Sequence, residues 1–272
     1  MHPTIRLPPG LIIPSYAVAL MAAVVACHMI GPRWAHRLEG IEPRMTRRTL
    51  LLAGLGAFVG GRLHFVAIHW FMFAHKPWDV LRFWSGLHAG GAIVGAVVAL
   101  AIALPRSGVP AWRLVDAIVP IVGVGIAIAR LGCFLHGCCF GIPCALPWCV
   151  TFPPDSYVYQ LHASLGLLSP GASRSAPVHP LQLYFAGAGL LVTATALAVR
   201  RRKRFDGEPT LVALLVYSTS AAALEFLRGE RTPRVFWGPL PQLEWVALAM
   251  TVATGAALVL ATRAHQRRPA EE

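Results

Sequence analysis

The amino-acid sequence predicts an all-α, polytopic membrane protein. Of its 272 residues, 56% are hydrophobic and only 13% are charged, whereas a soluble domain has about 25% charged residues. This leaves too little polar surface to cover a globule in water, so lipid must cover part of the molecule. Two patterns support this prediction: apolar runs of about 20 residues, the length that crosses a ~30 Å hydrocarbon core, and basic residues that gather between the runs.

Seven apolar runs predict about seven transmembrane helices within one integral membrane domain that covers residues 1–272. Small residues such as glycine allow neighbouring helices to approach closely in lipid, and the third run is rich in them. The runs cover residues 11–31, 49–74, 86–105, 112–130, 179–199, 208–227 and 241–262.

The basic residues alternate in density from one connecting segment to the next. Fifteen of the 24 lysines and arginines follow the first, third and fifth runs or lie in the tail, and seven lie on the opposite side. Because basic residues favour the cytoplasmic side, the N-terminus is expected in the periplasm and the C-terminus in the cytoplasm of a bacterial inner membrane. The long loop at about 131–178 is then periplasmic. The net charge of +12 marks no single soluble face, so no nucleic-acid partner is expected.

A dense motif follows the fourth run, from Arg130 to Gly141, with the sequence RLGCFLHGCCFG. An arginine can form two parallel hydrogen bonds to a phosphate group. Glycines allow the backbone to come close to a ligand. The motif therefore indicates an anion-binding site near the end of the fourth run.

Further polar residues lie in or beside other runs, where ionisable groups are costly and by default mark function or a buried partner. His88 precedes a glycine pair and could accept a proton near neutral pH. A His-Pro-Leu-Gln-Leu-Tyr element begins at His179, and Glu225 is followed by Arg228. Structural ion pairs and side chains that reach the interface remain the alternative for such residues; for Asp116 a structural arginine partner is equally plausible.

Together these motifs resemble the prolipoprotein diacylglyceryl transferase family. The family pattern R-x-G-C/N-F-x-N/H-G-x-x-x-G matches residues 130–141, the His-Pro-x-Gln-Leu-Tyr pattern matches 179–184, and the Glu-Phe-x-Arg pattern matches 225–228. Tyr16, Arg62 and Asp116 also fall at positions that the family uses. The resemblance covers nearly the whole chain, in order.

The resemblance implies transfer of a diacylglyceryl group from phosphatidylglycerol to the lipobox cysteine of a preprolipoprotein signal peptide, with release of glycerol phosphate. It implies no metal and no redox cofactor. The residues expected to be catalytic are His88, Arg130 and Glu225. Those expected to bind substrate are Tyr16, Arg62, Gly90, Gly91, Asp116, Cys133, His136, Gly141, His179, Gln182, Tyr184 and Arg228.

The sequence departs from the family pattern at several of these positions. The family has a histidine directly before the glycine pair, whereas here Ala89 is in that place and His88 is one residue earlier, a shift of ~100° around a helix. Cys133 and His136 stand where the family has asparagines, and Ala221 stands where it has an arginine. Two alternatives therefore remain: a related enzyme with another acceptor, and a non-catalytic lipid-binding protein.

We predict that His88 has taken over the role of the missing histidine. The neighbouring glycines could turn the backbone so that the imidazole faces Tyr16 and Arg130. The alternative is that His88 faces another helix and forms only a structural hydrogen bond.

Five of the six cysteines lie in one stretch, in a compartment that is expected to be oxidising, so disulfides are the leading expectation. An odd number leaves one thiol over, and the connectivity stays open. A zinc site that includes His136 is the less favoured alternative. The five are Cys133, Cys138, Cys139, Cys144 and Cys149.

The predicted orientation can be tested with reporters fused to the C-terminus. A reporter that is active only in the cytoplasm should be active, because the tail carries basic residues that favour that side. A fusion that is active only with a periplasmic reporter would contradict the orientation.

Overall fold

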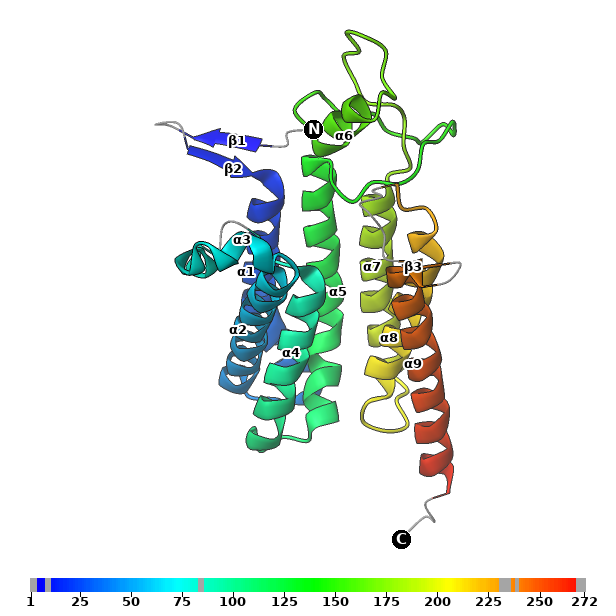
Figure 1. Ribbon diagram of the computed structural model, residues 1–272. Coiled ribbons are helices and arrows are strands. Elements are labelled where there is room, and N and C mark those ends of the chain that lie inside the picture. Colours follow the sequence, from blue (N-terminus) through cyan, green and yellow to red (C-terminus); the bar gives the residue numbers. More distant parts are fainter. Residues whose placement is uncertain (1–3, 8–10, 83–85, 230–235, 238–239, 268–272) are drawn as a thin grey trace. The chain divides into compact units, whose positions relative to one another are not determined.

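The structure is a computed structural model that describes residues 4–7, 11–82, 86–229, 236–237 and 240–267 (Figure 1). It is mostly helical, which confirms the all-α fold class. Within the described ranges, five helices are long and apolar enough to cross a membrane, and the number of seven spans stays a prediction. These helices are α1 (Ser15–Glu39), α2 (Pro43–Ile68), α5 (Ala111–His136), α7 (Leu181–Arg200) and α9 (Gln242–Gln266).

Two further helices match the third and sixth apolar runs, α4 (Ala89–Ala103) and α8 (Glu208–Glu225). Short elements connect the long helices, and two small antiparallel hairpins lie outside the all-α prediction. The short elements are α3 (Trp70–Ala74), η1 (Pro77–Leu81), η3 (Leu104–Arg106), α6 (Tyr157–Ser164), β1 (Thr4–Leu7), β2 (Leu11–Pro14), β3 (Phe236–Trp237) and β4 (Leu240–Pro241).

Several helix boundaries differ from the apolar runs. The run 49–74 is interrupted at His69, whose φ of −114° and ψ of 28° leave the helical region between α2 and α3. The first run begins in strand β2, and α1 starts only after Pro14. Helix α5 continues six residues beyond Arg130 to His136. Most of the dense motif is therefore held on a helix.

The chain forms two compact units. The minor unit contains residues 27–118, and the major unit contains residues 1–26 together with residues 119–272. Helices α1 and α5 each contribute to both units. That residues 1–272 form a single membrane domain stays a prediction.

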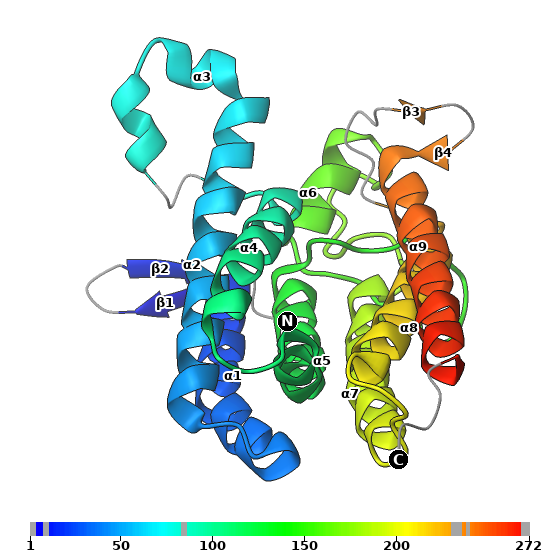
Figure 2. The ribbon, with the colours of Figure 1, turned by 90° about the horizontal axis from the view of Figure 1, so that it is seen from below.

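Glycines bring α2 and α4 together in the minor unit (Figure 2). A Cβ atom added to Gly56 would overlap the carbonyl oxygen of Gly95, and one added to Gly91 would overlap the carbonyl oxygen of Gly60. The two backbones are thus in direct contact, as the glycine content of the third run predicted.

In the major unit, α7, α8 and α9 lie side by side (Figures 1 and 2). Helix α5 packs on α7, where the hydroxyl of Thr193 donates a 2.8 Å hydrogen bond to the carbonyl oxygen of Pro120. The loop between α5 and α7 has its own buried core, against which Phe134 of α5 packs. That core consists of Phe140, Phe152, Val158 and Val178.

The glycine contact between α2 and α4 predicts different effects for two glycines of the same helix. We expect Gly56→Leu to lower the free energy of unfolding of the purified protein by about 1–3 kcal/mol, and its Tm with it, because leucine must push the helices apart. Gly54 has open space around its Cβ position, so Gly54→Leu should leave the Tm unchanged or raise it, since leucine is the better helix former. Equal Tm values for the two variants would show that the contact is unimportant.

Candidate functional site

Two arginines of the major unit lie over one buried aromatic ring. The guanidinium carbon of Arg130, on α5, is 4.3 Å from the ring centroid of Phe185, on α7. That of Arg228, just after α8, is 5.9 Å from the same centroid. Such cation–π contacts contribute about 0.5–2 kcal/mol each. Phe185 thus gathers two cations from different segments, although the sequence analysis did not single it out.

Glu225 fixes the orientation of Arg228. Its two carboxylate oxygens accept hydrogen bonds of 2.6 Å each from Nε and Nη2 of Arg228. Both side chains are largely shielded from solvent, with 12% and 13% exposure, so this forked ion pair is stronger than one on an open surface. Glu225 and Arg228, both predicted site residues, therefore form a direct ion pair.

Arg130 differs from Arg228 in its hydrogen bonding. Among the residues that the structure describes, no carboxylate or carbonyl oxygen accepts a hydrogen bond from Arg130. A guanidinium has five N–H donors and is always charged. The group is thus placed by its aromatic contact while its donors remain available for an anion.

A backbone crossing at Gly141 joins the loop after α5 to the start of α7 and the end of α8. The N–H of Gly141 donates to the carbonyl of His179 at 3.0 Å, and the N–H of His179 donates to that of Ile142 at 3.1 Å. On the other side, Ile142 donates to Leu227 at 2.7 Å and Gly229 donates to Phe140 at 3.0 Å.

No side chain fits at the centre of this crossing. A Cβ on Gly141 would lie 2.6 Å from the Cβ of His179 and 3.0 Å from the carbonyl oxygen of Leu227. Gly141 was expected to bind substrate. Its observed contacts give it a packing role, and its role in substrate binding stays a prediction.

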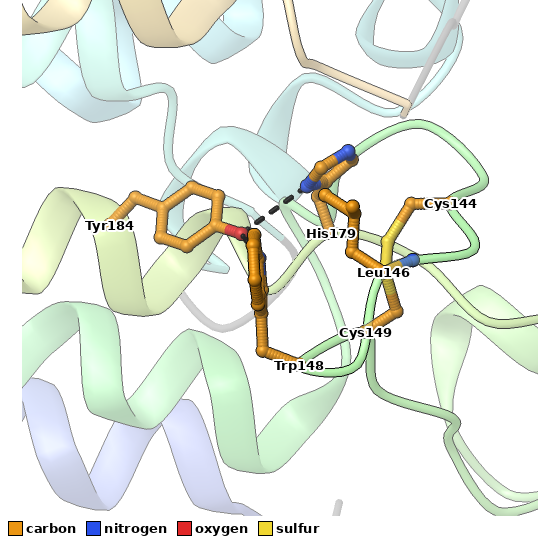
Figure 3. Close-up of a disulfide and its surroundings, with 6 residues drawn as sticks. All are labelled: Cys144, Leu146, Trp148, Cys149, His179 and Tyr184. Carbon is orange, nitrogen blue, oxygen red and sulfur yellow. Dashed lines mark hydrogen bonds between the residues drawn. A yellow bond between two sulfur atoms is a disulfide. The ribbon is translucent and has the colours of Figure 1, made fainter.

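The predicted residues His179 and Tyr184 are neighbours in space (Figure 3). The Tyr184 hydroxyl accepts a 2.9 Å hydrogen bond from the indole N–H of Trp148 and lies 3.2 Å from Nδ1 of His179. Trp148 comes from the small loop that the Cys144–Cys149 disulfide closes. It is a second contributor that the sequence analysis missed, because only the fold brings this loop to α7.

Two other predicted residues, Tyr16 at the start of α1 and His136 at the end of α5, contact each other. The ring of His136 lies 4.9 Å from that of Tyr16, edge to face. Tyr16 is 43% exposed, so one side of this pair stays accessible. A Cβ on Gly132 would collide with Ala19, and the glycine therefore allows α1 to approach α5.

Gln182 is fully buried. Its Nε2 donates a 2.7 Å hydrogen bond to the carbonyl oxygen of Cys138. This contact ties the dense motif to α7. The side chain was expected to bind substrate, which stays a prediction.

The cysteines differ from the expectation of a single leftover thiol. The Cys144–Cys149 disulfide, with its Cα atoms 6.1 Å apart, leaves Cys133, Cys138 and Cys139 as thiols. Their sulfur atoms all lie within 4.8 Å of one another. Hydrogen bonds with the Cys133 and Cys139 side chains, followed by burial, raise the pKa of the Cys138 thiol well above its usual range. The expected disulfide is present, whereas the expectation of a single leftover thiol was wrong, because only the pair Cys144–Cys149 is bonded.

The guanidinium of Arg62, in the minor unit, forms hydrogen bonds with backbone carbonyl groups of the same unit. It donates to the carbonyl oxygens of Asp79 at 2.6 Å, Val80 at 2.8 Å and Gly86 at 3.0 Å. Its side chain is also buried between aromatic rings. These contacts organise the segment between α2 and α4, and a role in substrate binding stays a prediction.

His88 lies at the N-terminus of α4. Its Nδ1 accepts a 3.3 Å hydrogen bond from the N–H of Gly90, which makes it the N-cap of the helix. Its ring centroid is 4.2 Å from that of His64 on α2. Gly91 supports this arrangement, because a Cβ there would overlap the side chain of His64.

His88 and Arg130 belong to different units, so the predicted proximity of the two stays a prediction. Asp116, at the start of α5, is fully buried in the minor unit. Its predicted role is also open.

Comparison with known proteins gives a consistent result. A family model described as prolipoprotein diacylglyceryl transferase matches residues 4–261. Among similar proteins, each named phosphatidylglycerol–prolipoprotein diacylglyceryl transferase, one from Azoarcus sp. is 30% identical over 93% of this chain and 92% of its own length. One from Aromatoleum aromaticum is 33% identical over 79% and 77%. One from Synechococcus elongatus is 33% identical over 52% and 48%, so this match spans about half of that relative.

Proposed function

The chain belongs to the prolipoprotein diacylglyceryl transferase family, and we propose that it catalyses this transfer itself. The acceptor is the cysteine thiol of a preprolipoprotein, and the donor is phosphatidylglycerol. A bond forms between the cysteine sulfur and the glyceryl carbon, while the bond from that carbon to the phosphate oxygen breaks. The diacylglyceryl thioether and glycerol phosphate are the products, and the thiol proton leaves through a base.

One observation carries the proposal: Arg130 is held in place over Phe185 with its donors uncommitted among the described residues. In this reaction, negative charge develops on the phosphate oxygen that leaves. A fixed guanidinium can donate two parallel hydrogen bonds to a phosphate group and stabilise that charge. Arg228, over the same ring, supplies a second positive charge to the same region.

The geometry favours a positioning role for Glu225. Both of its carboxylate oxygens accept hydrogen bonds from Arg228, which supports a role in orienting that arginine, and its catalytic role stays a prediction. A thiol has an ordinary pKa of ~8.5, so its ionisation needs a base near neutral pH. His88 remains our proposal for this base.

The chain is a multi-pass membrane protein by its apolar helices and its family. We propose that it lies in a bacterial inner membrane with its N-terminus in the periplasm. The loop that carries Gly141 and the Cys144–Cys149 disulfide would then lie on the periplasmic side, where a disulfide is stable. The signal peptide of the acceptor would be inserted in the same membrane and would reach the site from there.

Replacement of Arg130 by lysine tests the function. Lysine keeps the charge but cannot form a planar fork, so we expect Arg130→Lys to lower kcat about 10²–10³-fold, as for loss of a comparable transition-state contact. The assay measures transfer from phosphatidylglycerol to a lipobox peptide. Arg201→Lys, an exposed change in the loop after α7, serves as the matched control and should keep full activity.

The same variants can be compared in a bacterium that is depleted of its own transferase. The wild-type chain and Arg201→Lys should restore growth, and Arg130→Lys should not. Native-level activity of Arg130→Lys at an unchanged Tm would assign Arg130 a structural role. A wild-type chain that is folded and inserted but transfers nothing to the peptide would refute the proposed function.

A further inference from the structure

The three thiols of the dense motif form a compact cluster. The sulfur atoms of Cys133, Cys138 and Cys139 lie within 4.8 Å of one another, and all three residues are partly buried. The cluster comes from seven residues of one segment, Cys133 to Cys139. Its arrangement has two local causes, the cap of α5 and the turn that follows it.

The cap of α5 brings the first two cysteines together. Gly137 has a left-handed φ of +80°, and the N–H groups of Gly137 and Cys138 both donate to the carbonyl oxygen of Cys133, at 2.9 and 3.2 Å. This is the glycine cap in which the residue two positions beyond the helix folds back over its last turn. The side chains of Cys133 and Cys138 therefore meet as a consequence of how the helix ends.

A strained turn adds the third cysteine. Cys139 has a φ of +57°, and it is the one non-glycine residue with a positive φ in the described part of the chain. That conformation costs about 1–3 kcal/mol outside glycine and persists only where neighbouring structure enforces it. Gln182 anchors the carbonyl of Cys138, and Phe140 is buried in the loop core. The left-handed turn lets consecutive side chains contribute to one cluster.

We propose that Cys133, Cys138 and Cys139 bind a thiophilic metal ion, Zn(II) or Cu(I). Thiolates are the ligands that select these ions. At a Zn–S distance of ~2.3 Å, tetrahedral geometry places the sulfurs about 3.8 Å apart. The observed cluster needs a contraction of about 1 Å, which side-chain rotation supplies.

Three protein ligands suit both ions. Copper(I) accepts three thiolates, and zinc with three protein ligands keeps a fourth position open for water or another ligand. Binding replaces the thiol protons, so metal binding should release protons and weaken as the pH falls. The positive ion also relieves the repulsion between neighbouring thiolates. The zinc site that the sequence suggested as an alternative included His136. Among the described residues, the group of possible metal ligands consists of the three cysteines and does not include His136. This proposal does not rest on the proposed transfer activity.

Cobalt(II) titration of the full-length, reduced protein under anaerobic conditions tests the site, with Co(II) as the probe for Zn(II). We expect one equivalent of Co(II) to produce intense sulfur-to-cobalt charge-transfer absorption, and one equivalent of Zn(II) to remove it. In a separate arm, Cu(I) should be retained against a Cu(I) chelator. Cys133→Ser, Cys138→Ser and Cys139→Ser should each weaken binding at least ~10-fold. Cys27→Ser, which removes a thiol on α1, is the matched control and should bind as the wild type does.

Alkylation kinetics provide a test that needs no variant. Bound Zn(II) or Cu(I) should slow the alkylation of Cys133, Cys138 and Cys139 while that of Cys27 is unchanged. Three outcomes would overturn the proposal: no charge-transfer band and no Cu(I) retention, equal binding by Cys139→Ser and wild type, or a disulfide among the three cysteines in the protein as isolated from cells. Intact transfer activity in a chain that binds no metal would leave the proposed function standing.

Discussion

The backbone crossing at Gly141 is the constraint on which the candidate site depends. Four hydrogen bonds between main-chain groups tie the loop after α5 to the start of α7 and to the segment after α8. Two predicted site residues, His179 and Arg228, lie at the points where α7 and the segment after α8 join this loop. Because these hydrogen bonds join main-chain groups, they fix the backbone positions of the two residues and leave the polar groups of the side chains available. Glycine is required there because a Cβ atom would lie within 3.0 Å of its neighbours on both sides.

The hydrogen bonds of the three arginines distinguish those with a structural role from the one proposed to bind an anion. Arg62 gives its donors to three carbonyl oxygens of the minor unit, and Arg228 gives its own to Glu225. Arg130 is positioned by a ring instead, and a ring restrains the guanidinium while leaving the N–H groups in its plane available. An anion site needs a guanidinium that is held in place while its N–H groups stay available to the anion.

The sequence predicted the helical membrane class and the segments that meet in the site, because apolar runs and the motifs at 130–141, 179–184 and 225–228 are local patterns. It did not predict Phe185 or Trp148. A buried phenylalanine in an apolar helix has no distinctive signal, and Trp148 reaches Tyr184 from a disulfide-closed loop that is 36 residues away in the sequence. The clustered cysteines were named, but one leftover thiol was expected where the structure has three; the left-handed turn at Cys139 cannot be recognised from residue type.

Hydrogen exchange of the native protein, compared with two alanine variants, tests the central claim that one crossing holds the site segments together. The amides of Gly141, Ile142, His179 and Gly229 should exchange slowly and with the same opening free energy. In Gly141→Ala all four should lose protection together, whereas in Gly187→Ala, where a Cβ on α7 meets open space, they should keep it. Unrelated exchange rates, or a protected His179 amide in Gly141→Ala, would contradict the account.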